Sequence, residues 1–157
     1  MVVEAYCDRQ IPAVVENLLA YQRDAPIHIR LVSQSVHDFR LPDGRLFSEK
    51  LKQLVTFKDA KITMLVNPDK MQAENDRELL AEFENMGVKV HLKKGLHAKL
   101  VLLDSRKDKA ALIMSANLTP TSLWKRKEIA VYILNELEHV HAKLYNYTTN
   151  LLKEKPP

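Results

Sequence analysis

The sequence contains a single cysteine, Cys7, so no disulfide can form within the chain. It has no apolar run long enough to span a bilayer. The opening MVVEAYCDRQ lacks the basic n-region of a secretory signal. We therefore expect a protein of a reducing, cytoplasmic compartment, with no stable membrane association.

Patterns of metal ligands are also missing. The six histidines are scattered, and together with the single cysteine they do not form a spacing typical of zinc ligands. His139 and His141 stand two apart in a predicted helix, which turns their side chains away from each other. We expect no zinc site.

The 157 residues are 46% hydrophobic and 28% charged, which is typical of a globular domain. We find no internal repeat, linker or low-complexity tract, so residues 1–157 are expected to form a single domain.

Hydrophobic periodicity predicts four helices and seven strands. The helices are expected at residues 11–21, 46–57, 75–86 and 136–153, the third opening on a capping box of Asn75 and Glu78 and stopping at Gly87. The strands are expected at residues 2–7, 27–36, 61–68, 88–93, 97–104, 111–116 and 128–134. This order favours an α/β fold, a mixed sheet of about seven strands with helices on both faces. No helix separates the last four strands, so we expect them to be antiparallel neighbours.

The most informative stretch is HAKLVLLD, which ends at Asp104, together with the following MSAN. Side chains alternate along a strand, so His97 and Lys99 lie on one side of theirs. Ser115 and Asn117 are also two positions apart and therefore lie on one side as well. If the two strands are neighbours, these four side chains can converge at one end of a sheet. Such a set suits a phosphate: lysine supplies charge, serine and asparagine supply neutral donors, and histidine can attack or transfer a proton.

The arrangement H-x-K-x4-D followed by S-x-N resembles the signature of the phospholipase D superfamily. Its positions are held here by His97, Lys99, Asp104, Ser115 and Asn117. Glu128 stands where members of the family often carry an acidic residue. Two features depart from the usual pattern: Met114 replaces a glycine, and the gap from Asp104 to Ser115 is longer. The resemblance covers nearly the whole chain and implies the same architecture.

The resemblance also implies a mechanism. His97 of one subunit attacks phosphorus and forms a phosphohistidine, while His97 of the other donates a proton to the leaving oxygen. Lys99 and Asn117 bind the non-bridging oxygens, and Ser115 adds a hydrogen bond. Glu128 accepts from the histidine ring. No metal or other cofactor is expected, because the lysines take the place of a cation.

Asp104 belongs to the motif, although a carboxylate at a strand end can equally anchor a turn. The chain has one copy of the motif, whereas enzymes of this kind generally build one active site from two. The resemblance therefore implies a homodimer in which two His97 side chains face each other. The alternative is a monomeric, inactive binding module.

Charge favours a nucleic acid as the substrate. Between His91 and Ala130 there are nine basic and three acidic residues, although the net charge of the whole chain is only +4. Basic residues near the motif are therefore candidates for binding phosphates. These are Lys94, Arg106, Lys107, Lys125, Arg126 and Lys127. Trp124 lies among them and can stack on a base, or pack on the core beneath a loop.

We therefore expect a metal-independent phosphodiesterase, most simply an endonuclease acting on DNA or RNA. Two other functions stay open. A phospholipid hydrolase or transferase would need a membrane-docking segment, and the last helix mixes acidic and basic residues on its polar face. A catalytically weak nucleic-acid-binding module would not need His97.

Overall fold

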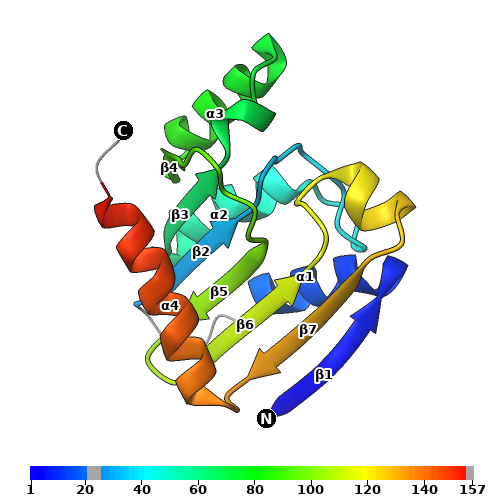
Figure 1. The fold of residues 1–157 in the computed structure, drawn as a ribbon, viewed down its shortest axis with the longest axis vertical. Coiled ribbons are helices and arrows are strands. Elements are labelled where there is room, and N and C mark those ends of the chain that lie inside the picture. Colours follow the sequence, from blue (N-terminus) through cyan, green and yellow to red (C-terminus); the bar gives the residue numbers. More distant parts are fainter. Residues whose placement is uncertain (21–25, 155–157) are drawn as a thin grey trace.

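The computed structural model describes residues 1–20 and 26–154, and its centre is one mixed seven-stranded sheet (Figure 1). The strands are β1 (Val2–Cys7), β2 (His28–Val32), β3 (Lys61–Val66), β4 (Lys89–Leu92), β5 (Leu100–Asp104), β6 (Lys109–Met114) and β7 (Ile129–Leu134). Their order across the sheet is β1-β7-β6-β5-β2-β3-β4. The pairs from β1 to β2 are antiparallel, and β2, β3 and β4 run parallel.

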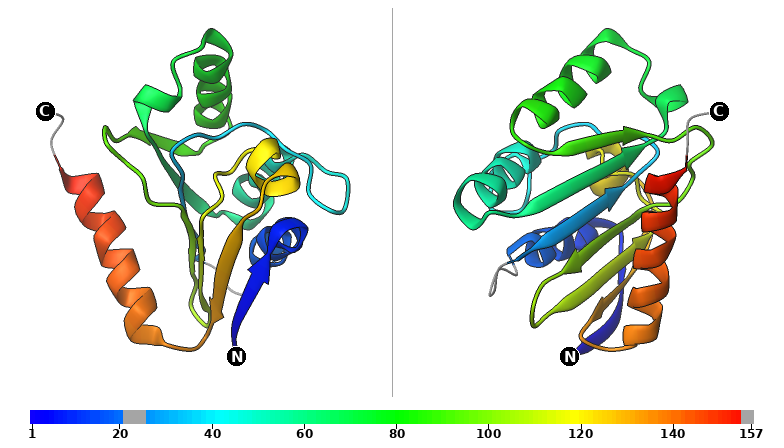
Figure 2. Two further views of the ribbon diagram at one scale, coloured as in Figure 1. Left: turned by 45° about the vertical axis from the view of Figure 1, so that its right-hand side comes forward. Right: turned by 90° about the vertical axis from the view of Figure 1, so that its left-hand side faces the viewer.

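Helices cover both faces of this sheet. They are α1 (Ile11–Ala20), α2 (Phe47–Lys58), α3 (Glu74–Asn85) and α4 (Glu138–Lys153), joined by short helical turns η1 (Asp8–Gln10), η2 (Pro68–Lys70) and η3 (Thr121–Lys125). The larger core lies between the sheet and α1, α2 and α3. A smaller core lies between α4 and the opposite face, and Figure 2 shows α4 and α1 on opposite sides of the sheet. The predicted fold class is confirmed.

The local signals explain most element boundaries. Helix α1 begins at Ile11 with Pro12 in its first turn, where the missing N–H costs nothing. Its predicted end at Tyr21 lies outside the described residues. Gly87 follows α3 with φ of +103°, and an added Cβ there would lie 2.9 Å from Cγ1 of Val55, so both backbone and space require glycine.

Three details of the sequence prediction were wrong. Helix α3 is capped at Ala73, whose N–H donates to the side chain of Asp76 at 3.2 Å, and not by Asn75 with Glu78. Strand β4 pairs with β3 and not with β5, because α3 forms the crossover of a parallel β–α–β unit. The strand predicted at residues 97–104 is only β5, since its ladder with β2 begins at Leu100.

Candidate active site at one end of the sheet

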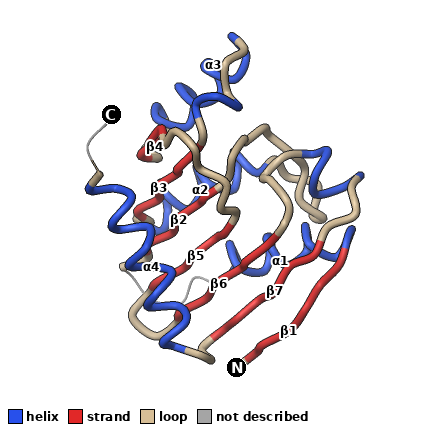
Figure 3. Tube along the Cα trace, viewed as in Figure 1, coloured by secondary structure: helices blue, strands red, loops and turns tan. Residues whose placement is uncertain are grey.

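All the predicted catalytic residues except Asp104 lie where four strands begin or end. Leu100 at the start of β5 pairs with Ile113 near the end of β6, and Met114 pairs with Ala130 at the start of β7. The segments before β5, after β6 and before β7 therefore meet at one end of the sheet, together with the segment that follows β2. Figure 3 shows these segments as loops at the same end.

His97 lies in the extended segment before β5 and is exposed. Its Nδ1 lies 2.8 Å from the side-chain Nε2 of Gln34, a residue in the loop after β2. This contact leaves Nε2 of the ring as the nitrogen directed away from Gln34. The sequence prediction missed Gln34, although the polar run SQS after the apolar strand IHIRLV marks a place where polar side chains collect.

Lys99 is half-buried and fixed through its backbone. Its carbonyl oxygen accepts from the N–H of Met114 at 3.1 Å, which joins the His97 segment to β6. Its Nζ donates to the carbonyl oxygen of His97 at 3.3 Å, so the ammonium lies beside the histidine. The Met114 side chain is buried in the larger core.

The Asn117 side chain is held so that its amide nitrogen can donate to a ligand. The backbone N–H of Gln34 donates to Oδ1 at 3.1 Å, and the hydroxyl of Ser33 lies 3.1 Å from the same oxygen. An N–H donor fixes the amide orientation, because it must face the oxygen and not the nitrogen. Nδ2 then points its two hydrogens elsewhere, as a neutral donor suited to a phosphate oxygen.

Ser115 and Glu128 form a second pair at this end. The Ser115 hydroxyl donates to the Glu128 carboxylate and accepts from the N–H of Ile129 at 3.0 Å. The backbone N–H of Glu128 donates to Asp8 at 3.0 Å, which fixes the start of β7. Within a single chain, Glu128 therefore accepts from Ser115. The residue that contacts the His97 ring is Gln34, and not Glu128 as predicted.

Asp104 lies apart from this group. It ends β5, roughly 20 Å along the chain from His97 at the strand rise of about 3.3 Å per residue. There it forms an ion pair with Lys109 at 2.8 Å, which closes the turn to β6. Arg106 and Lys107 stand in that same turn. The structure therefore separates these three residues from the active site and gives Asp104 the role of anchoring a turn.

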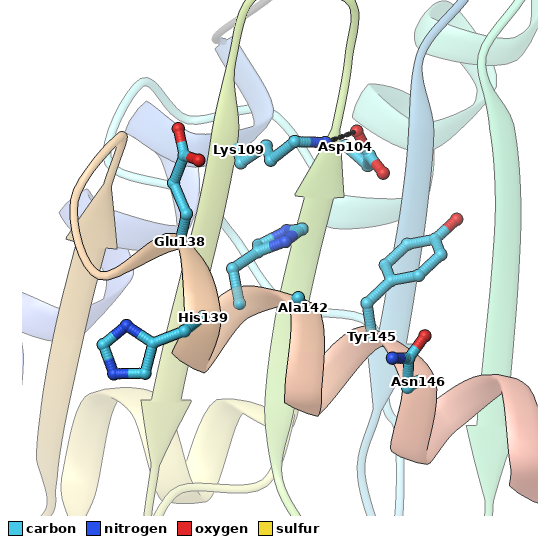
Figure 4. Close-up of a pocket in the computed structure, with 8 residues that line it drawn as sticks. Asp104, Lys109, Glu138, His139, Ala142, Tyr145 and Asn146 are labelled. Atoms are coloured by element: carbon cyan, nitrogen blue, oxygen red, sulfur yellow. Dashed lines mark hydrogen bonds and ion pairs between the residues drawn. The ribbon is translucent and has the colours of Figure 1, made fainter.

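A hollow of about 400 Å³ lies at this far end, between α4 and the sheet (Figure 4). Its lining includes Asp104, Lys109 and two α4 histidines. His139 is exposed and projects away, whereas His141 is buried with Nε2 2.9 Å from the carbonyl oxygen of Leu103. Burial lowers the pKa of His141, and the hydrogen bond to Leu103 opposes that shift. The two histidines point apart, as predicted.

Trp124 packs and does not lie open to stack on a base. Its Nε1 donates to the carbonyl oxygen of Arg40 at 2.9 Å, and the half-buried ring contacts the larger core. After it come Lys125, Arg126 and Lys127, all exposed on the loop that leads to Glu128. Lys94 is also exposed, in the turn before His97.

Residues 1–20 and 26–154 contain no group of three or more His, Cys, Asp or Glu side chains placed to hold a metal ion. In the same part of the chain, no helix has both the length and the apolar character needed to cross a bilayer.

Comparisons with known proteins identify the family and the fold. Residues 10–151 match the model of a family described as cardiolipin synthase, PLD-like domain. A search of curated protein sequences returns no significant match.

Solved structures share the fold at low identity. NucT from Helicobacter pylori aligns with a TM-score of 0.73 and 14% identity, over 97% of this chain and 96% of its own. Nuc from Salmonella typhimurium, described as a phospholipase D family member, gives 0.69 and 16%, over 94% and 92%. A polyphosphate kinase from Porphyromonas gingivalis gives 0.76 and 16% over 99% of this chain, which spans only 27% of the kinase. The chain belongs to the phospholipase D-like domain family.

Proposed function

We propose that the protein is a metal-independent phosphodiesterase that cleaves nucleic acid through a phosphohistidine, in an active site shared by two copies of the chain. The observation that carries this proposal is the meeting of His97, Lys99 and the oriented amide of Asn117 at one end of the sheet. Together they offer a nucleophile, a cation and a neutral donor to one phosphate.

Each residue has one part in the reaction. Nε2 of one His97 attacks phosphorus, which forms an N–P bond and breaks the bond to the leaving oxygen. The second His97 gives that oxygen a proton, then takes a proton from the water that hydrolyses the phosphohistidine. Lys99 and Asn117 offset the negative charge on the non-bridging oxygens. Ser115, paired with Glu128, adds a hydroxyl beside them.

The second histidine requires a second chain, and an apolar surface beside the site suits that partner. We call it the β1–β7 patch, and it lies on the sheet face that carries α4. Its exposed aliphatic side chains are Val3, Ile113, Ile129 and Val131, with exposed fractions of 50, 36, 67 and 40%. Cross-strand pairing places them on one face, next to Ser115. Contiguous apolar surface of this kind is typical of a protein interface.

The charge around the site favours a nucleic acid. Lys94 precedes His97, and the run of three basic residues at 125–127 precedes Glu128, so exposed cations lie in two of the segments that lead to the proposed phosphate position. A polymer of phosphodiesters can contact both groups while one of its phosphates reacts.

The test compares the wild-type protein with His97→Ala and with His139→Ala, an exposed histidine at the other end of the sheet. Labelled single- and double-stranded DNA and RNA are incubated in EDTA, and a denaturing gel detects both cleavage and a covalent protein–nucleotide adduct. We expect cleavage and an acid-labile adduct with the wild type and His139→Ala, and neither with His97→Ala.

Three results would contradict the proposal. Binding without cleavage by the wild type would favour a nucleic-acid-binding module. Cleavage of phospholipid vesicles without cleavage of any nucleic acid would move the substrate to lipids. Equal activity in His97→Ala would show that the reaction does not use this site.

A further inference from the structure

We propose that Gln34 is the positioning residue for His97: its carboxamide holds the ring with the proton on Nδ1, so that Nε2 presents its lone pair to phosphorus. This inference rests on the proposed function for its consequence in catalysis, but the tautomer of His97 can be measured without any substrate. Neither the motif nor the family signature assigns a role to Gln34.

The backbone of Gln34 is fixed from both sides. Its N–H donates to Oδ1 of Asn117 at 3.1 Å, and its carbonyl oxygen accepts from the N–H of Asn67, after β3, at 3.0 Å. The loop after β2 is thus tied to segments after β6 and β3. The side chain therefore starts from a rigid point, which is what the orientation of a nucleophile requires.

The side-chain contact admits two arrangements. The amide nitrogen of Gln34 lies 2.8 Å from Nδ1 of His97, and a half-turn of the carboxamide exchanges that nitrogen for the oxygen. With nitrogen toward the ring, Nδ1 accepts and the ring proton is on Nε2, which then cannot attack. With oxygen toward the ring, Nδ1 donates and Nε2 carries a lone pair.

The second arrangement suits both histidines of the shared site. A neutral nucleophile and a protonated general acid both carry a proton on Nδ1, so one oxygen acceptor serves both states. A carboxamide has no charge and therefore does not by itself favour the protonated ring, unlike a carboxylate. The ammonium of Lys99 lies beside His97, and the Glu128 carboxylate is paired with Ser115.

The experiment uses two variants of similar size. Gln34→Met removes both polar atoms, whereas Gln34→Glu keeps an oxygen acceptor and cannot donate. Gln72→Met makes the methionine substitution at an exposed glutamine in the loop before α3 and serves as the control. Nitrogen-15 spectra of histidine-labelled protein report the tautomer of His97, which is assigned by its disappearance in His97→Ala. Thermal unfolding checks that each variant is folded.

We expect Gln34→Met to lower the fraction of His97 rings protonated on Nδ1 and to reduce kcat by about 10- to 100-fold, with little change in KM. Gln34→Glu is expected to retain the Nδ1 proton, and Gln72→Met to resemble the wild type. The inference is overturned if the His97 spectrum of Gln34→Met equals that of the wild type, or if Gln34→Glu loses the Nδ1 proton. The spectra decide this even if the wild type cleaves no phosphodiester, so the two proposals fail separately.

Discussion

The ring of His141 lies 2.9 Å from the carbonyl oxygen of Leu103, and this bond joins α4 to the middle of the sheet. The ring is only 3% exposed, so it meets β5 in an environment that disfavours a positive charge. Burial lowers the pKa of His141, and Asp104 beyond it is already paired with Lys109. The folded protein therefore keeps this histidine neutral at a pH where the unfolded chain binds a proton.

Stability is consequently expected to fall as the pH drops below about 6.5, the ordinary pKa of histidine. The contribution of His141 is fully present above that value and is lost as the pH falls toward the lowered pKa of the folded state. For this one group the slope is at most about 1.4 kcal/mol per pH unit. Urea unfolding between pH 5 and 8 measures it. His141→Gln can still donate to Leu103 and does not titrate, so equal slopes in the variant and the wild type would contradict this assignment.

Arg30 on β2 is expected to hold the C-terminal half of α4 on the sheet. Its Nη1 donates to the carbonyl oxygen of Tyr145 and lies within 2.7 Å of the hydroxyls of Thr148 and Thr149, while its guanidinium stacks 3.7 Å from the Tyr145 ring. Arg30→Met keeps the aliphatic stem and removes these contacts. We expect a loss of about 1–3 kcal/mol in the free energy of unfolding, measured in urea.

The control for Arg30 is Arg77→Met, at an exposed arginine on α3. A change at an exposed position of this kind is expected to stay within about 0.5 kcal/mol. Similar losses in the two variants would show that the contacts of Arg30 with α4 contribute nothing specific.

The β1–β7 patch is expected to form the dimer interface. Ile129 is 67% exposed, so Ile129→Asp costs a monomer little but places a charge inside the interface. Light scattering should report a monomer, and cleavage should be lost although circular dichroism is unchanged. Phe57→Asp, at a 76% exposed phenylalanine on α2 and the opposite face, should remain a dimer. A dimer of Ile129→Asp with full activity would place the interface elsewhere.

The basic residues near the site and those in the β5–β6 turn should contribute differently to nucleic-acid binding. Lys125 and Arg126 lie at the site end of the sheet, whereas Arg106 and Lys107 lie in the β5–β6 turn at the far end. Reversal of both charges at 125 and 126 is expected to weaken binding and to reduce the slope of log K against log salt by about 2. The same reversal at 106 and 107 should leave the slope unchanged. Fluorescence anisotropy at several salt concentrations measures both, and equal effects would show that binding is not centred on His97.

The fold could be predicted because the signals that indicate helices and strands lie within short stretches of the sequence. Apolar periodicity located the helices and strands, and the motif spacing placed His97, Lys99 and Asn117 together. Periodicity does not reveal where strand pairing stops, so it predicts a strand at His97 and Lys99, where the backbone is irregular. It also could not show that β4 pairs with β3, which follows from the handedness of a crossover.

The partners of the site residues were the least predictable feature. Gln34 is separated from His97 by 63 positions, and Ser33 from Asn117 by 84. No pattern of spacing connects residues this far apart in one sequence. For Asp104 the error is the reverse, because residues close in sequence lie apart in the structure. The motif groups Asp104 with His97 by their order in the chain, but β5 carries Asp104 to the other end of the sheet.

The assembly of the site from distant segments also determines when activity arises during folding. His97 meets Gln34 only after β2 and β5 have paired, and Glu128 meets Ser115 only after β7 has joined β6. Long-range strand pairing is slow, because the entropy of closing a long loop is lost before the contacts form. A nascent chain that has not yet made residue 128 has the histidine and lysine of the motif but no complete catalytic centre. Recovery of cleavage after dilution from urea should therefore report the completed sheet, and not the earlier formation of its helices.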